Sequence, residues 1–492
     1  MKNKLFISLA LATSFWASAQ QKNTFLEASF WKTSPNINAI KAEITKGNSP
    51  SEYNQSSFDP VVLAINNDAP TETIKFLIEQ PGNSVNKNTH DNRIYLHWAA
   101  YKGNLEIINY LIAKGSDINL EDSHGTTPIA FAAGNGLTNT AVYDAFFKAG
   151  IDPKKKYKGG TNLLLMAIPS DKNLALSNYF SSKGLSLTDT DSDGKTAFDY
   201  AARTGDLTLL KTLVQKGIKY TGDALIFAAQ GSRRESNPIE VYQYLVDELK
   251  IKPTSTNKEG ETVLHILARK PNQTEIINYF LAKGLDVNKA DNEGNTVLMN
   301  AATNKEIKII ELLLAKSNLN AQNTKGESAL TIAVKSGSVE AIELLLNKGA
   351  NINVLDKDGN NLGFYLIQSY KPAGNTPNPF AAKVKILQEK GLNLAAAQKD
   401  GNTLYHLAVV KNDIALLKDI ASINIDINAK NKDGLTALHK AAMIGKDDIL
   451  LKYLIANGAK KEITTEFDES AYSLAKENES LTKNKVSIEF LK

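Results

Sequence analysis

Apolar residues recur along this chain at a helical spacing. Ile107, Ile108, Leu111 and Ile112 fall at positions i, i+1, i+4 and i+5, which together form one stripe along an α-helix. The helix is expected to end at Gly115, because glycine readily adopts the left-handed conformation that terminates helices. A polar loop follows, so the stripe predicts one amphipathic helix with a single buried face.

The next segment predicts a second kind of helix. Thr126, Thr127 and Pro128 indicate a helix start, in which a threonine hydroxyl caps the first turn and proline takes the first helical position without losing a hydrogen bond. The helix that follows is rich in small residues such as Ala132 and Ala133. Small side chains allow neighbouring helices to approach closely, so we expect this helix to pack against copies of itself.

The helix pair returns at a nearly fixed period. Most steps between equivalent glycines are 32 to 35 residues, one step of 66 spans two units, and one step of 42 contains an insertion. Such a period indicates one supersecondary unit copied along the chain, with faces buried only against its neighbours. The glycines that mark the period are Gly125, Gly159, Gly194, Gly260, Gly294, Gly326, Gly359, Gly401 and Gly434.

The residues after these glycines carry a recurring motif. Residues 434–442 read Gly-Leu-Thr-Ala-Leu-His-Lys-Ala-Ala, and residues 260–268 read Gly-Glu-Thr-Val-Leu-His-Ile-Leu-Ala. Both resemble the Gly-x-Thr-Pro-Leu-His-x-Ala-Ala signature of the ankyrin repeat, as do residues 401–408 and 125–133. The resemblance covers residues 25–480. It implies an all-α ankyrin-repeat solenoid of about 13 helix–turn–helix repeats with short hairpin-like finger loops.

Four parts follow from this pattern. Residues 1–19 have the features of a secretory signal peptide, with Lys2 and Lys4 before an apolar run and a small-x-small cleavage site; a first core helix is the alternative. Residues 20–90 are expected to be degenerate N-terminal capping repeats, residues 91–465 the repeat array, and residues 466–492 a C-terminal capping half-repeat with a polar tail. The protein is therefore expected in the periplasm or outside the cell.

Two insertions interrupt the period, at residues 231–238 and 370–380. Each falls between the two helices of one unit. Insertions in repeat proteins form loops, often on the binding face. We therefore expect both segments to lie near the partner-binding surface.

Composition narrows the possible functions. The chain has no cysteine, which excludes disulfides, thiolate metal sites and cysteine nucleophiles. Basic and acidic residues nearly balance, at 57 and 53, and only five of the basic residues are arginine. A nucleic-acid binder would carry a stronger basic bias, so no nucleic-acid partner is predicted. No segment after the leader is apolar for long enough to span a membrane, and a stack capped at both ends is expected to be a monomer.

No catalytic constellation, cofactor site or metal site is predicted. Four of the six histidines stand three residues after a helix start, where the ankyrin resemblance implies that the ring satisfies backbone and capping groups. His90 and His124 fall on adjacent finger tips, but two ligands without a third make a weak metal site. The acidic run at residues 191–194 resembles a calcium loop, yet Ala202 stands where the loop needs a glutamate. The four helix-start histidines are His97, His265, His406 and His439.

Because no catalytic site is predicted, we expect the protein to act by binding a partner on its surface. The ankyrin resemblance implies a concave groove, lined on each first helix by the residues nine and ten positions after the period glycine. Four of the five arginines fall in three consecutive repeats and suit carboxylate or phosphate groups, although a chance cluster of solvated charges is the alternative. Lys335–Ser336 and Val410–Lys411 also occupy groove positions. The predicted groove residues are Tyr101, Lys102, Arg203, Arg233, Arg234, Arg269, Lys270, Met443 and Ile444.

The resulting hypothesis is a non-enzymatic protein–protein interaction scaffold that acts outside the cytoplasm and holds a protein or peptide in its groove. One alternative is a recognition arm with an unrecognised hydrolytic or metal-dependent activity, which would require a polar cluster with perturbed pKa values. A second alternative is an exported effector that binds host proteins.

Overall fold

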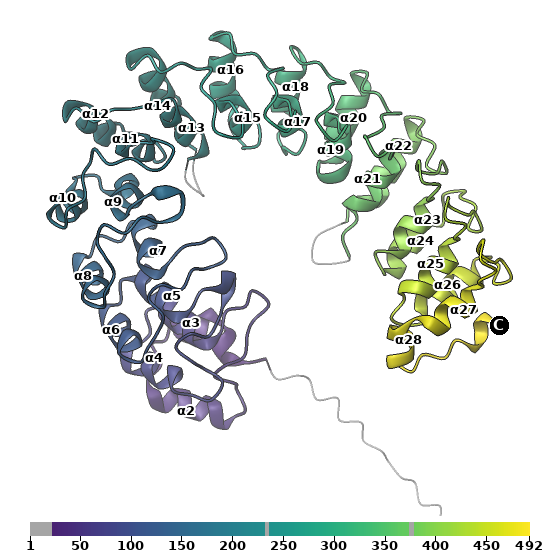
Figure 1. Ribbon diagram of the computed structural model, residues 1–492, viewed down its shortest axis with the longest axis horizontal. Helices are drawn as coiled ribbons and strands as arrows, with labels where there is room; N and C mark the ends of the chain where they lie inside the picture. The colour runs from purple at the N-terminus through teal and green to yellow at the C-terminus, as the bar shows by residue number, and fades with distance from the viewer. Residues whose placement is uncertain (1–21, 232–235, 373–377) are drawn as a thin grey trace, which may run out of the picture. The chain divides into compact units, whose positions relative to one another are not determined.

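The computed structural model describes residues 22–231, 236–372 and 378–492. Within these ranges the chain forms 28 α-helices joined by short loops, and no β-strand is present (Figure 1). Successive helices form fourteen pairs. The odd-numbered helix of each pair is the first helix of a repeat and the even-numbered one is the second helix. The predicted all-α array of helix–turn–helix repeats is confirmed, with one pair more than expected.

The chain is divided into two compact units. The first unit comprises Met1–Ala201 with Asp206–Tyr220, and the second comprises Ala202–Gly205 with Thr221–Lys492. Within each unit, a first helix packs against the first helix of the next pair, as α5 does against α3 and α7. The first unit contains α1 (Ala28–Trp31), α2 (Ile37–Thr45), α3 (Pro60–Asn66), α4 (Thr71–Ile78), α5 (Tyr95–Lys102), α6 (Leu105–Ala113), α7 (Pro128–Gly134), α8 (Thr140–Lys148), α9 (Leu163–Ala167), α10 (Ala175–Ser182), α11 (Ala197–Ala201) and α12 (Leu207–Gln215).

The second unit continues the same arrangement. Figure 1 shows its first helices α15, α17, α19 and α21 on the inner side and the second helices α16, α18 and α20 on the outer side. Its helices are α13 (Asp223–Gln230), α14 (Ile239–Gln243), α15 (Val263–Leu267), α16 (Thr274–Ala282), α17 (Val297–Ala301), α18 (Ile307–Leu314), α19 (Ala329–Ser336), α20 (Val339–Asn347), α21 (Leu362–Ser369), α22 (Phe380–Glu389), α23 (Leu404–Val409), α24 (Ile414–Ile420), α25 (Ala437–Ile444), α26 (Ile449–Ala456), α27 (Ala471–Glu477) and α28 (Glu479–Lys483).

Small residues pack the first helices together. Ala301 at the end of α17 and Ala302 directly after it are fully buried, and the second helix α18 buries the larger Ile309, Ile310 and Leu313. Within each unit the interior is therefore continuous from pair to pair, because each pair covers the apolar face of its neighbours. The division between small first-helix residues and large second-helix residues is the one that the sequence predicts.

Backbone hydrogen bonds join neighbouring finger loops. The amide of Thr324 donates to the carbonyl of Glu293 (2.8 Å), and the amide of Lys357 donates to the carbonyl of Lys325 (2.9 Å). At the finger turn, Gly326 has φ +82°, and an added Cβ would lie 2.6 Å from the Lys357 nitrogen. Glycine is therefore required at this point both for its conformation and for the close approach of the next finger.

One predicted detail of the helix start is wrong. The α7 helix begins at Pro128 as expected, but the hydroxyl of Thr127 is buried without a hydrogen-bond partner. In the repeats that start at Thr262, Thr403 and Thr436, a histidine three residues later engages the threonine. Ala130 stands at that position in α7, so the Thr127 hydroxyl has no such group to meet.

The predicted leader at residues 1–19 lies outside the described residues, as do Arg233 and Arg234 of the first insertion. Among the helices that are described, none combines the length and the apolar character needed to cross a membrane.

Candidate partner-binding surface

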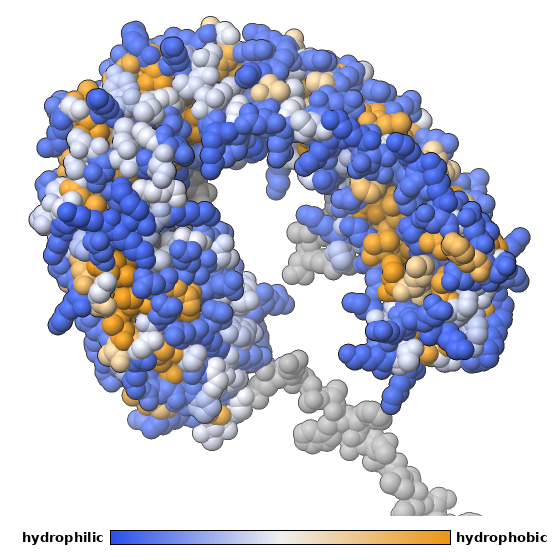
Figure 2. Space-filling model, in the orientation of Figure 1, coloured by the Kyte–Doolittle hydropathy of each residue, from blue (hydrophilic) through white to orange (hydrophobic). Residues whose placement is uncertain are grey.

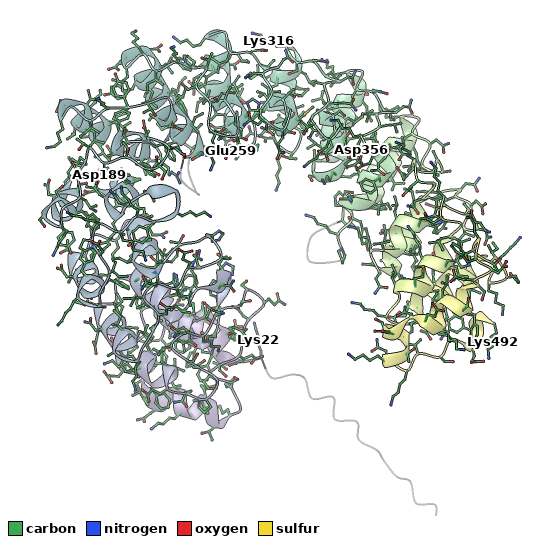
Figure 3. The ribbon with its side chains drawn as sticks, in the orientation of Figure 1. Lys22, Asp189, Glu259, Lys316, Asp356 and Lys492 are labelled. Carbon is green, nitrogen blue, oxygen red and sulfur yellow. The ribbon has the colours of Figure 1, made fainter. Side chains whose placement is uncertain are left out.

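The groove positions of the second unit lie at the ends of its first helices, on its inner side. In Figure 3, Glu259 and Asp356 lie along this inner side, whereas Lys316, just after α18, lies on the outer side. Since Glu259 and Asp356 both belong to finger turns, the fingers and the first-helix ends share one face of the unit. This is the face on which the groove residues are predicted.

Two predicted groove residues meet around the end of α13. The Arg203 guanidinium lies 4.8 Å from the centre of the Phe227 ring, and its Nη2 donates to the side-chain oxygen of Gln230 (3.3 Å). Lys270 Nζ donates to the backbone carbonyl of the same Gln230. Burial, together with the nearby Arg203 charge, lowers the pKa of the Lys270 ammonium. The structure thus places cations from separate repeats around one residue; Arg203 and Lys270, with neighbouring Arg269, are called the basic patch below.

Arg269, the third member of the basic patch, forms an ion pair with a carboxylate. Its Nη1 lies 2.6 Å from Glu261 Oε1. Burial alone would raise the pKa of Glu261, but hydrogen bonds from Arg269 and Asn257 hold that pKa below its usual value. Arg269 follows the period glycine by nine residues and Glu261 by one. In the repeat of Arg203, the position of Glu261 is occupied by Lys195.

In the first unit, Tyr101 and Lys102 lie at the end of α5. Tyr101 is exposed, and its ring centre lies 5.6 Å from that of Phe131. Lys102 Nζ forms an ion pair with Asp68 (2.7 Å) and donates to the carbonyl of Asn66 (3.2 Å). The two predicted groove residues border a hollow of about 330 Å³, but the lysine charge is already matched by Asp68.

Apolar side chains gather at the groove positions of the last repeats. Val410, Met443 and Ile444 are 60%, 47% and 46% exposed. Figure 2 shows a corresponding hydrophobic area over α23 to α26. Met443 and Ile444, which the register predicts to lie in the groove, are therefore exposed apolar side chains rather than charged ones.

The four helix-start histidines have a structural role. His265 Nε2 lies 3.2 Å from the carbonyl of Asn295 in the next repeat, and its Nδ1 lies 3.1 Å from the amide of Thr262. A carbonyl only accepts, so Nε2 carries the proton and Nδ1 accepts from the amide. Burial lowers the pKa of His265, which favours this neutral form. The ring thus joins one helix start to the following finger, as the ankyrin resemblance implies.

The other histidine pair does not make a metal centre. His90 Nε2 and His124 Nε2 lie 3.5 and 3.3 Å from the same oxygen of Asp91, so the two finger tips do approach each other. Among the described residues, however, no group of three or more metal-ligating side chains is present.

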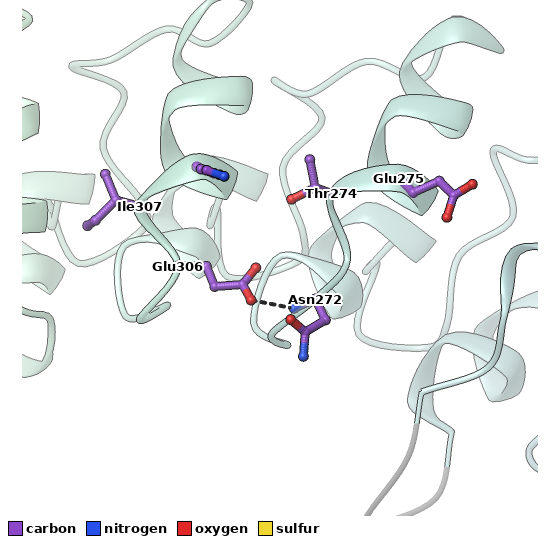
Figure 4. A pocket seen from close by; sticks show the side chains of 6 residues that line it. Asn272, Thr274, Glu275, Glu306 and Ile307 are labelled. Atoms are coloured by element: carbon purple, nitrogen blue, oxygen red, sulfur yellow. Dashed lines mark hydrogen bonds between the residues drawn. The ribbon is translucent and has the colours of Figure 1, made fainter.

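A hollow of about 610 Å³ lies beside the α16 and α18 starts (Figure 4). The backbone amide of Asn272 donates to Glu306 Oε1 (2.9 Å), while Glu275 points away from Glu306. Two carboxylates directed apart do not form an acid–base pair.

Sequence reasoning missed one charged residue at this surface. Lys383 lies on α22, after the second insertion, and is only 2% exposed. Its Nζ donates to the carbonyl of Val334 on α19, 49 residues earlier (2.8 Å). The insertion shifts α22 out of the period, so the repeat register does not reveal this contact. A lysine among the apolar positions of a buried helix is the one sequence signal that points to it.

Comparisons with known proteins agree with the repeat geometry. A family model described as ankyrin repeats (3 copies) matches residues 61–157, 225–323, 264–356 and 313–377. A second, described as ankyrin repeats (many copies), matches residues 405–455. Together these matches cover more than half of the chain, and the chain belongs to the ankyrin repeat family. The predicted family and solenoid class are confirmed.

Several curated proteins are similar to this chain. The human transient receptor potential cation channel subfamily A member 1 is 25% identical over 391 residues, which are 76% of this chain and 31% of that protein. The Caenorhabditis elegans ankyrin repeat and KH domain-containing protein mask-1 is 25% identical over 274 residues, or 54% of this chain and 10% of that protein. The intracellular phospholipase A2 of the same organism is 27% identical over 181 residues, or 34% of this chain and 16% of that protein.

The chain thus spans less than a third of the length of each of these relatives. The channel and lipase activities in their names belong to those proteins. The likeness shared by proteins with such different names is an array of ankyrin repeats, which are generally non-enzymatic protein-interaction modules.

Proposed function

We propose that this protein is a non-enzymatic scaffold that acts outside the cytoplasm and holds a protein or peptide partner along the inner side of its first helices. The observation that carries the proposal is the convergence of Arg203 and Lys270 on Gln230. Arg203 donates to the side-chain oxygen of Gln230 and Lys270 donates to its backbone carbonyl, and two cations from separate repeats that lie this close together attract an anionic group. The basic patch therefore favours a partner with acidic side chains.

Individual charges in the basic patch differ in their expected contributions. Lys270 forms no ion pair with a described carboxylate, whereas Arg269 is held by Glu261. Partly buried cations contribute more to binding than exposed ones at a rim, because water competes less with the partner. Lys270 should therefore contribute more than Arg269, and the exposed Val410, Met443 and Ile444 would add apolar contact further along the unit.

A binding experiment tests this division. A partner captured by crosslinking the purified chain in its own extracellular or envelope fraction should bind the Arg203→Ala/Lys270→Ala variant at least tenfold more weakly than the parent. Affinity should also fall as salt rises. Lys316→Ala removes an outer-side lysine and serves as the matched control, with unchanged affinity. Equal binding by the double variant and the parent would contradict the proposal.

Export and a monomeric state are also part of the proposal. Export rests on the basic start, the apolar run and the small-x-small site of residues 1–19. Mass spectrometry of the protein made in its own cell should give a mature N-terminus at Gln20, and light scattering should give the mass of one chain. A retained Met1 would contradict cleavage, and a dimer mass would contradict the monomer.

A further inference from the structure

A basic pocket lies on the inner side of the second unit, apart from the basic patch. It has a volume of about 280 Å³ and lies between the ends of α19 and α21 and the start of α22. Its polar lining consists of three lysines, two serines and one asparagine. These residues are Lys335, Ser336, Ser369, Lys371, Asn378 and Lys383.

Lys383 occupies the place of an asparagine in other repeats. Asn304 donates to the carbonyls of Ala268 (2.8 Å) and Lys270 (2.9 Å) at the end of α15. Ala268 follows its period glycine by eight residues, and Val334, the acceptor of Lys383, does the same in its own repeat. Asn237 and Asn478 donate to the equivalent carbonyls of two further repeats. In these other repeats of the unit, a neutral asparagine thus donates to the carbonyl at the end of the first helix.

An ammonium group at this position leaves donors to spare. The asparagine amide of Asn304 has two N–H groups, and both are used. The Lys383 ammonium has three N–H groups, and the Val334 carbonyl is its one protein partner among the described residues. A buried donor that lacks an acceptor is costly, so the spare N–H groups require something in the pocket.

Positive charge in the pocket is not balanced by the protein. No carboxylate of the described residues forms an ion pair with Lys371 or Lys383, and Lys335 has only a loose contact with Glu327 at 3.7 Å. By contrast, Lys102 of the first unit also donates to a first-helix carbonyl but has Asp68 as its counter-ion. Burial, and secondarily the charge of Lys371, lowers the pKa of Lys383 to about 8, as expected for a buried ammonium that lacks an anion.

Other polar groups complete the lining. Ser336 and Ser369 end their first helices at the pocket, and Pro379, which precedes the first residue of α22, borders it as well. The start of a helix carries partial positive charge and adds to the field of the lysines. The Ser369 hydroxyl already donates to the Leu366 carbonyl (2.7 Å), so the Ser336 hydroxyl and the lysine ammonium groups are the donors left for a ligand. These donors suit an oxyanion with several acceptor oxygens and more than one negative charge.

From this geometry we infer that the pocket formed by Lys335, Lys371 and Lys383 is a binding site for a phosphate group. The group has two possible sources, free inorganic phosphate or a phosphorylated side chain of a bound peptide. A phosphate dianion matches the unbalanced charge better than a single carboxylate does. The inference stands on residues other than the basic patch, so it holds or fails separately from the proposed function.

Calorimetry on the full chain provides the test, with inorganic phosphate, a phosphoserine peptide, and the same peptide with glutamate at the modified position as probes. We expect phosphate to bind, and Lys383→Gln to weaken it at least tenfold while keeping a donor for Val334. Lys371→Gln, an exposed change that leaves the interior intact, should weaken phosphate about threefold or more. Lys385→Gln on the same helix, where the side chain is exposed and paired with Glu389, should bind like the parent.

The peptide probes separate the possible sources. Phosphoserine peptide that binds tenfold more tightly than free phosphate identifies a phosphorylated partner, and equal affinities identify free phosphate as sufficient; both outcomes support the site. The inference is overturned if phosphate does not bind, if Lys371→Gln and Lys383→Gln both bind like the parent, or if the glutamate peptide binds as tightly as the phosphoserine peptide. If Lys383→Gln does not fold, Lys371→Gln alone decides.

Discussion

The repeats that start at Gly294 and Gly359 belong to the same unit but are built differently. In the first, α17 presents the small Ala301 and Ala302 to its neighbours; in the second, α21 presents Leu366 and Ile367 at the same two positions. A short turn containing Asn304 joins α17 to α18, whereas an insertion separates α21 from α22. Both repeats still supply a donor to the preceding first helix.

This comparison separates what the fold requires from what it permits. A buried carbonyl at a helix end requires a donor, because leaving it unpaired costs stability. The neutral Asn304 meets that requirement without a charge, and its side-chain oxygen also accepts from the Glu306 amide (2.9 Å). Lys383 meets it with a buried charge, which burial penalises. A buried lysine costs more than an asparagine, and an asparagine could donate to this carbonyl equally well. The presence of Lys383 at this position therefore indicates a role beyond folding.

The largest expected effect is on the regular repeat. Ala301→Asp would bury a carboxylate between α17 and its neighbours, at a cost of roughly 3 kcal/mol or more. Because each repeat contacts only adjacent repeats, amide hydrogen exchange should rise near α15 to α19 and change little at α25. The matched Ala301→Ser change should cost much less, since a hydroxyl carries no charge. Loss of protection along the entire unit would contradict nearest-neighbour stabilisation.

A smaller effect concerns pH and the interrupted repeat. Burial lowers the pKa of Lys383 from its ordinary value of 10.5 to about 8. Below pH 8 the lysine is charged in both folded and unfolded chains and its full penalty applies; above pH 10.5 it is neutral in both and the penalty is gone. The parent should therefore gain stability relative to Lys383→Met as pH rises from about 8 to 10.5.

That gain should reach at least about 2 kcal/mol, since one pKa unit corresponds to about 1.4 kcal/mol. Urea unfolding of both proteins across this range measures it, and the difference between them cancels the titration of other lysines and tyrosines. Lys335 and Lys371 also line the pocket, so a Lys371→Gln background should reduce the gain. Parallel stability curves would show that Lys383 has an ordinary pKa.

Much of the fold follows from the sequence because each unit repeats the same local solution. The period glycines locate the finger turns, and the small residues after them predict the packed first helices. Even the ion pair between Arg269 and Glu261 lies at fixed positions of the repeat, nine and one residues after Gly260. A search of the repeats for opposite charges at these two positions would therefore have predicted the ion pair from the sequence.

The remaining features depend on departures from the repeat. Thr127 was expected to cap α7 but remains unpaired, because Ala130 replaces the histidine that engages threonine in other repeats. Lys383 reaches Val334 only because the insertion changes where α22 starts. A contact across 49 residues cannot be read from a period of about 33, so the phosphate pocket emerges only from the folded chain.

The smallest expected effect compares the two donors directly. Asn304→Leu removes hydrogen bonds to the carbonyls of Ala268 and Lys270 and the one from the Glu306 amide, and should destabilise the unit by about 1.5 kcal/mol or more because these groups lose their partner. Lys383→Met removes one hydrogen bond to Val334 but also a buried charge, so these terms oppose each other and the change at pH 7 should stay within about 1 kcal/mol. Urea unfolding in phosphate-free buffer measures both.

Addition of phosphate should then stabilise the parent and Asn304→Leu but not Lys383→Met, since only Lys383→Met lacks the ammonium group. If Lys383→Met proves more destabilising than Asn304→Leu without phosphate, the main role of Lys383 is to stabilise the fold through its hydrogen bond to Val334, not to bind a ligand.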